Sequence, residues 1–136
     1  MSLNTDTSTA EVELTPFEII GGEEAVRKMV DRFYDIMDSA PEAAGLRAMH
    51  ADDLSPMRER LSEFLNAWLG GPRTYFERED RKCIMSAHRP FAIGEAERDA
   101  WMMCMRQALE DCGVSEDMRT LLDRPFARMC EAFRNR

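Results

Sequence analysis

Apolar residues recur along this chain with the spacing of amphipathic helices, and no segment reads convincingly as a strand. The clearest pattern falls at i, i+3, i+4, i+7, i+8 and i+11, the period that places residues on one helix face. It consists of Val26, Met29, Val30, Phe33, Tyr34 and Met37. Tyr34 is therefore expected to point inward with the core, and the fold class is predicted as all-α.

A short helix is predicted before this stripe. Residues 15–18, Thr-Pro-Phe-Glu, are typical of a capping box with proline at the first helical position, and Gly21-Gly22 stops the helix within about two turns. The preceding residues are rich in Ser, Thr, Asn, Asp and Glu. We predict a mobile tail over residues 1–15 and one folded domain over residues 16–136.

The middle of the chain carries further start and stop signals. A short helix is expected after Pro41, and a longer one before the Gly70-Gly71-Pro72 stop. Residues 73–82 are polar and irregular, and Pro90 limits any helix at His88, which is expected at or near a helix end. The inward positions of the longer helix are Met57, Leu61, Phe64, Leu65 and Trp68.

Two longer helices are predicted to finish the chain, one near residues 94–111 and one from Ser115 onward, with Gly113 between them and a kink at Pro125. Their inward positions are Trp101, Cys104, Met105, Ala108 and Cys112 in the first, and Met118, Leu121, Leu122, Phe126, Met129 and Phe133 in the second.

Charge and cysteine usage narrow the class of protein. The 18 basic residues are dispersed among 26 acidic ones for a net charge of −8, which argues against nucleic-acid binding. No apolar run approaches the roughly 20 residues needed to cross a bilayer, and the polar start does not resemble a signal peptide, so we expect no membrane contact and a cytoplasmic location. The four cysteines show no CxxC spacing, which favours reduced, buried thiols over disulfides and makes a zinc site a weak alternative.

Four side chains that carry hydrogen-bonding groups lie within or beside the apolar faces: Tyr34, His50, His88 and Trp101. An imidazole is the usual protein ligand to haem iron, and its second nitrogen can donate to a backbone carbonyl. However, a lone histidine is more often structural, and stripes of Met and aromatic residues are more often core. From the residues alone, a helical interaction module therefore remains open.

The order of several segments resembles the group II truncated haemoglobins. The two double-glycine breaks, the His-x-Pro-Phe-x-Ile segment and the Glu-Arg-Asp-x-Trp segment occur in that family's order and spacing. The matching segments are Gly21-Gly22, Phe33-Tyr34, residues 50–54, residues 70–75, residues 88–94, and residues 97–101 running on to Cys104-Met105.

This resemblance implies a truncated globin fold, a two-over-two helical sandwich around haem b, with His88 as the ligand to iron. It places Tyr34, His50 and Trp101 on the distal side, and Arg60, Thr74 and Tyr75 near the haem propionates. The further haem contacts that it implies are Phe33, Met57, Leu61, Phe64, Met85, Arg89, Phe91, Ile93 and Met105. The sequence departs from the family at Ala87, where a basic residue is common, at Ala51, where proline is common, and at His50, where Phe or Tyr is more usual.

The implied function is binding of oxygen, nitric oxide, carbon monoxide or peroxide, for redox chemistry rather than bulk oxygen transport. Donors on the distal side would retain a ligand that gains negative charge, because hydrogen bonds to charged groups are the stronger ones. An external reductase would be required, and a homodimer is left open. The alternatives are a haem-based ligand sensor or interaction module without turnover, and a haem-free helical protein that has kept the fold.

Overall fold

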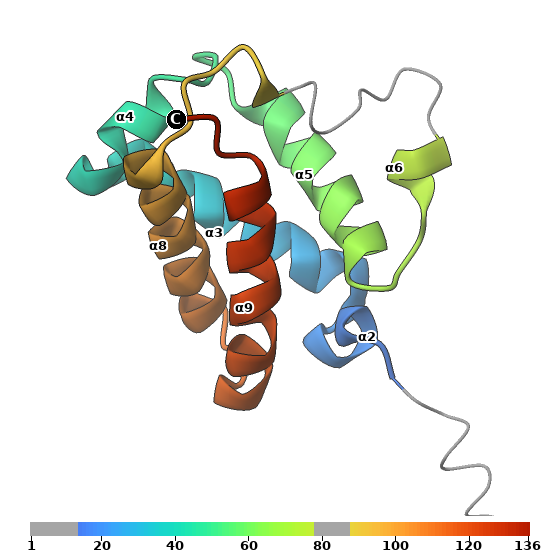
Figure 1. Cartoon of the computed structure of the whole chain (residues 1–136). Coiled ribbons are helices and arrows are strands. Elements are labelled where there is room, and N and C mark those ends of the chain that lie inside the picture. Colours follow the sequence, from blue (N-terminus) through green and yellow to red (C-terminus); the bar gives the residue numbers. More distant parts are fainter. Residues whose placement is uncertain (1–13, 78–87) are drawn as a thin grey trace, which may run out of the picture.

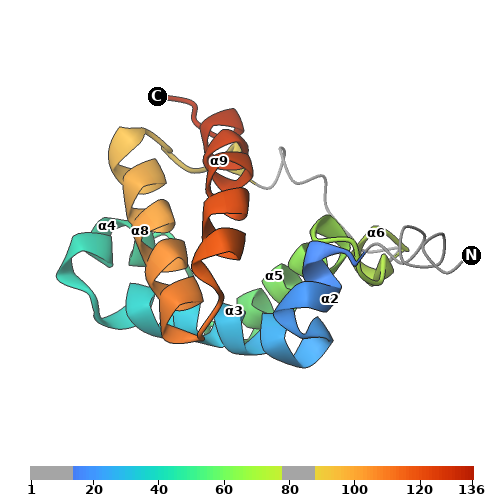
Figure 2. The same cartoon turned by 90° about the horizontal axis from the view of Figure 1, so that it is seen from below.

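The computed structural model describes residues 14–77 and 88–136 of the chain, and these residues form helices joined by short turns. Helix α3 packs against both α5 and α8, and α8 packs against α9. Figures 1 and 2 show two antiparallel pairs, α3 with α5 and α8 with α9, crossing one another. The helices are α2 (Pro16–Ile20), α3 (Gly22–Ser39), the 3-10 turn η1 (Pro41–Ala43), α4 (Ala44–Arg47), α5 (Ser55–Trp68), α6 (Thr74–Glu77), α8 (Glu95–Asp111) and α9 (Glu116–Ala132).

The predicted start of the first helix is confirmed. The Thr15 hydroxyl accepts a hydrogen bond from the Glu18 amide at 3.2 Å, and the Glu18 carboxylate accepts one from the Thr15 amide at 3.0 Å. Gly21 ends the helix with a φ of 125°, a conformation that suits glycine.

The second glycine pair lets α2 lie against the end of α5. A Cβ at Gly70 would come within 2.9 Å of the Thr15 side chain, and one at Gly71 within 2.6 Å of the Phe17 ring. The Phe17 amide donates to the Leu69 carbonyl at 3.0 Å. These glycines therefore permit a close approach of helices as well as stopping α5.

The core is formed by the stripe of α3 and the facing sides of α5, α8 and α9. Every member of the predicted α3 stripe is buried. The largest side chains with almost no exposure include Phe33, Met37, Leu65, Met105 and Phe126. The all-α prediction is confirmed by the fold, and no strand occurs in residues 14–77 or 88–136.

Several local predictions were wrong. Residues 73–82 were expected to be irregular, but Thr74–Glu77 forms the one-turn helix α6, because Tyr75 is buried against Phe64. The rest of that stretch, residues 78–82, lies outside the described residues. Leu121 is 59% exposed, since the buried stripe of α9 recurs every four residues and leaves position 121 facing away. Helix α9 runs through Pro125, and the kink predicted there stays a prediction.

The cysteines are free thiols in the part of the chain that the structure describes. Burial raises the pKa of Cys104 to about 11 and that of Cys130 to about 12, so both stay protonated. Cys112 was expected on the inward face but is exposed, because it caps the end of α8. Cys83 lies outside the described residues, and within them no cluster of potential metal ligands is found.

None of the described helices is long and apolar enough to cross a membrane.

Candidate haem and ligand site

The fold brings three of the four predicted hydrogen-bonding side chains, Tyr34, His50 and Trp101, together with Phe33. We call these four residues the Tyr34 cluster. The Tyr34 and Phe33 ring centroids are 4.9 Å apart with the rings edge to face, and the Phe33 and Trp101 centroids are 5.1 Å apart. The Tyr34 and His50 ring centroids are 6.0 Å apart. Side chains from α3, α8 and the turn after α4 therefore converge.

Tyr34 is a neutral phenol. The residue is 3% exposed, and burial raises its pKa far above the usual value for tyrosine, although the nearby Arg58 charge acts in the opposite direction. Its hydroxyl has no hydrogen-bond partner in the part of the chain that the structure describes. A protonated phenol without a partner is available to donate a hydrogen bond to a guest molecule.

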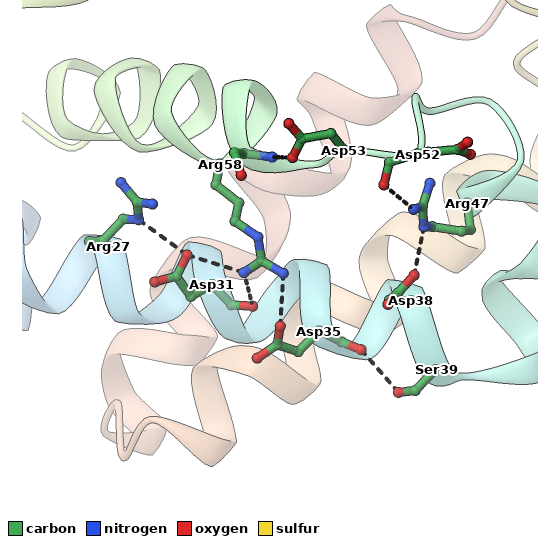
Figure 3. A network of polar contacts seen from close by, with 10 residues as sticks. Arg27, Asp31, Asp35, Asp38, Ser39, Arg47, Asp52, Asp53 and Arg58 are labelled. Carbon is green, nitrogen blue, oxygen red and sulfur yellow. Dashed lines mark hydrogen bonds and ion pairs between the residues drawn. The ribbon is translucent and has the colours of Figure 1, made fainter.

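Arg58 binds the turn of α3 that carries Tyr34. From α5 its guanidinium donates to the Asp31 carbonyl at 2.9 Å and to the Asp31 and Asp35 carboxylates at 3.1 and 2.8 Å (Figure 3). The guanidinium carbon also lies 5.8 Å from the centre of the Tyr34 ring. The pairing ties α5 to the turn of α3 that carries Tyr34.

His50 is fixed by its own turn. Its Nδ1 lies 2.9 Å from the Leu46 carbonyl oxygen. Because a carbonyl only accepts, Nδ1 carries the proton, and in the neutral ring Nε2 is an acceptor or a metal ligand. Burial, with smaller effects of Arg47 and His88, lowers the pKa of His50 below its ordinary value, so the ring is neutral at pH 7.

Arg47 anchors the turn on which His50 lies. It pairs with the Asp38 carboxylate at 2.8 Å and donates to the Ala51 and Asp52 carbonyls, each at 3.0 Å (Figure 3). Three contacts from one side chain therefore hold both ends of the turn against α3.

His88 is half-buried and helical, and a turn at Arg89 and Pro90 follows it, as predicted. An electrostatic interaction with His88 is the smallest of the causes that act on the pKa of His50. The His88 ring also stacks on Phe133, with centroids 4.1 Å apart and planes 3° from parallel. Both histidines thus border the same region of the molecule.

The other predicted haem contacts lie in varied surroundings. Phe33 and Met105 are fully buried, and Phe64 and Tyr75 pack edge to face at 5.5 Å. Met105, with Met102 and Phe126, also lines a groove between α8 and α9. Half-buried positions are Arg60, Leu61 and Ile93, exposed ones are Met57, Thr74, Arg89 and Phe91, and Met85 lies outside the described residues.

Sequence reasoning missed Arg47, Arg58, Phe133 and Asn135 as residues around the site. Asp31 and Asp35, four residues apart on one helix face, offered a signal for a basic partner. Phe133 was expected to point inward, but nothing in its spacing indicates contact with His88. Asn135 carries no local signal, because its partners lie more than forty residues away.

The residues present fit a haem. His88 is a half-buried imidazole, and Tyr34, whose hydroxyl has no hydrogen-bond partner among the described residues, lies beside His50 in the Tyr34 cluster. Leu61 and Trp101 are side chains with large apolar surfaces that are left half-exposed. A ligand to iron, a preset donor and an apolar lining are the parts that a haem pocket needs.

The comparisons with known proteins agree with this assignment. The family model "Bacterial-like globin" matches residues 15–135. Group 2 truncated hemoglobin YjbI of Bacillus subtilis is 34% identical over 107 residues, 79% of this chain and 78% of that protein.

Solved structures show the same fold. The group II 2-on-2 haemoglobin of Agrobacterium tumefaciens superposes with a TM-score of 0.85 and 35% identity, over 91% of this chain and 96% of its own. A truncated oxygen-avid haemoglobin from Bacillus subtilis gives 0.80 and 30%, over 90% and 100%. The chain therefore belongs to the bacterial-like globins and is a group II truncated haemoglobin, a member of a family that binds haem and small ligands.

Proposed function

We propose that the chain holds haem b through His88 and binds oxygen, nitric oxide, carbon monoxide or peroxide against Tyr34, Trp101 and His50. The observation that carries this proposal is the hydroxyl of the buried residue Tyr34, which has no hydrogen-bond partner among the described residues. The Tyr34 side chain lies in one cluster with Trp101 and His50. The Bacillus subtilis relative described as oxygen-avid supports retention of oxygen in this fold.

The protonation state of each distal side chain decides whether it donates or accepts a hydrogen bond. Tyr34 stays protonated and donates, and the Trp101 indole N–H can only donate. His50 is neutral with its proton on Nδ1, so its Nε2 is free to accept a hydrogen bond from a protonated guest. Donors aimed at a ligand that gains negative charge retain it, and the neutral imidazole can take up a proton during peroxide cleavage.

Haem, when bound, supplies an iron that binds diatomic gases and exchanges electrons, so oxidation of nitric oxide to nitrate or reduction of peroxide would consume electrons that an external reductase restores. His88 and its neighbours hold that group, and Arg60, Thr74 and Tyr75 would meet its propionates. The homodimer and the cytoplasmic location stay predictions.

The experiment is a haem titration followed by two reactions. We expect a Soret band that saturates at one haem per chain. Ferrous protein equilibrated with oxygen should then give nitrate on mixing with nitric oxide, or ferric protein should consume peroxide. Absence of a Soret band would refute haem binding. Haem binding with neither reaction would instead favour a sensor or interaction module without turnover.

A further inference from the structure

The last residues of the chain lie against the segment that follows His88. The Asn135 side chain accepts from the Ile93 amide and donates to the Phe91 carbonyl, both at 2.8 Å. The Ile93 carbonyl accepts from the amides of Asn135 and Arg136 at 2.8 and 3.1 Å. Figures 1 and 2 show the C-terminus after α9 folding over this segment.

These bonds form a closed set. Asn135 uses its amide, its side-chain carbonyl and its side-chain NH₂ on two residues of the same short segment. Arg134 holds the last residue of the chain to α9, because its guanidinium donates to the Glu131 carboxylate at 3.1 Å and to the Arg136 carbonyl at 3.0 Å. The segment 91–93, which has no helical hydrogen bonds of its own, is thereby fixed to the end of α9.

Phe133 extends the same contact to His88 itself. The two rings are nearly parallel at 4.1 Å, so the phenyl ring covers one face of the imidazole. The direction of a histidine's ligating lone pair depends on the torsions of its side chain. A ring packed on one face restricts those torsions.

We propose that Phe133 and Asn135 are positioning residues for His88, so that the C-terminal end of α9 sets the orientation of the imidazole toward iron. Phe133 limits rotation of the ring, and Asn135 fixes the backbone at Phe91 and Ile93, three and five residues after His88. This inference rests on the proposed role of His88 as the haem ligand. It adds a requirement for the last four residues, which lie far along the chain from His88.

The test compares Phe133→Leu, Phe133→Tyr and Asn135→Ala with wild type, with Leu121→Ala as the matched control on the exposed side of α9. The first readout is the iron–histidine stretching band of the ferrous protein by resonance Raman. We expect the band to shift or broaden in Phe133→Leu and Asn135→Ala, and to stay unchanged in Phe133→Tyr and Leu121→Ala. Haem loss should be faster in Phe133→Leu by about two- to tenfold, the worth of one aromatic pair.

A second readout needs no haem. The chain has two histidines, so the ring protons of His88 can be assigned by NMR with a His50→Gln reference. Stacking should shift them upfield in wild type and Phe133→Tyr, and the shift should disappear in Phe133→Leu. A wild-type band unchanged in both Phe133→Leu and Asn135→Ala would overturn the inference while leaving haem binding intact. A wild-type protein that takes up no haem would instead refute the proposed function, whatever the NMR shift.

Discussion

The Tyr34 cluster and the segment around His88 are supported in different ways. Tyr34 and Trp101 project from α3 and α8, two long helices packed directly on each other, and Arg58 and Arg47 fasten the surrounding backbone with short ionic contacts. His88 instead stands at the start of a turn whose neighbours Arg89, Pro90 and Phe91 are exposed. That turn is held by the C-terminal residues.

The two halves of the site therefore tolerate change differently. The Tyr34 cluster is part of the core, so altering it costs stability of the whole fold. The His88 segment depends on a small number of hydrogen bonds and one ring contact, so it can adjust locally with little effect on the rest.

Phe33→Ala should break the support of the Tyr34 cluster. Phe33 is fully buried and contacts both Tyr34 and Trp101, so its removal leaves a cavity that costs about 3–5 kcal/mol of unfolding free energy. Urea denaturation measures the loss. Leu121→Ala, on an exposed face, should stay within about 0.5 kcal/mol of wild type. Similar losses for the two variants would contradict the assignment of Phe33 to the core.

Tyr34→Phe and Trp101→Phe should weaken ligand retention, and because both keep an aromatic ring in the Tyr34 cluster they should destabilise the fold less than Phe33→Ala. Each removes one donor to a charged ligand, worth about 1.5–3 kcal/mol, or about ten- to a hundredfold faster oxygen release. Stopped-flow displacement of oxygen by carbon monoxide gives the rates. If neither variant releases oxygen faster than wild type, these donors do not face the ligand.

Arg58→Met tests how much the ion pairs between α5 and α3 contribute to the free energy of unfolding. Arg58 and Arg27 each lie 3.1 Å from the Asp31 carboxylate, but their side chains are 21% and 48% exposed, so solvent screens Arg27 more strongly. We expect Arg58→Met to cost about 1–2 kcal/mol of unfolding free energy, since several hydrogen bonds to charged groups are lost. Arg27→Met should cost roughly 0–0.5 kcal/mol. Equal costs would show that the link to the backbone under Tyr34 adds nothing.

His50 should give the smallest effect, a pH dependence. Its pKa in the folded protein is lowered by burial, so between the folded and unfolded pKa values the unfolded chain binds more protons. Stability contributed by the neutral ring is therefore full above the unfolded pKa of about 6.5 and is lost as pH falls through the folded pKa. Unfolding free energies at pH 7.5 and 5.5 should differ more for wild type than for His50→Gln. An equal difference in both proteins would contradict a buried, neutral His50.

The features that could be predicted from the sequence are those that depend on neighbouring residues. The helix face of Val26, Phe33 and Tyr34 was predicted correctly because a 3.6-residue period is local information. The start at Thr15 and the stop at Gly21 depend on adjacent residues and were also correct. The family resemblance, which the comparisons confirm, supplied His88 as the expected haem ligand.

The remaining features depend on partners distant in sequence. Nothing near Asn135 indicates that it bonds residues 91 and 93, and nothing near Phe133 indicates a stack on His88. Leu121 and Cys112 were misassigned because apolar character alone does not fix which side of a helix faces its neighbour. Met57 is likewise apolar yet 38% exposed, at the first turn of α5.

Haem binding by His88→Gly, with and without added imidazole, tests most directly whether His88 is the ligand to iron. Wild type and His50→Gln should give the absorption spectrum of a histidine-ligated haem. His88→Gly should lose that spectrum and recover it when free imidazole fills the space left by the side chain. An unchanged spectrum in His88→Gly without imidazole would contradict the assignment of His88 as the ligand to iron.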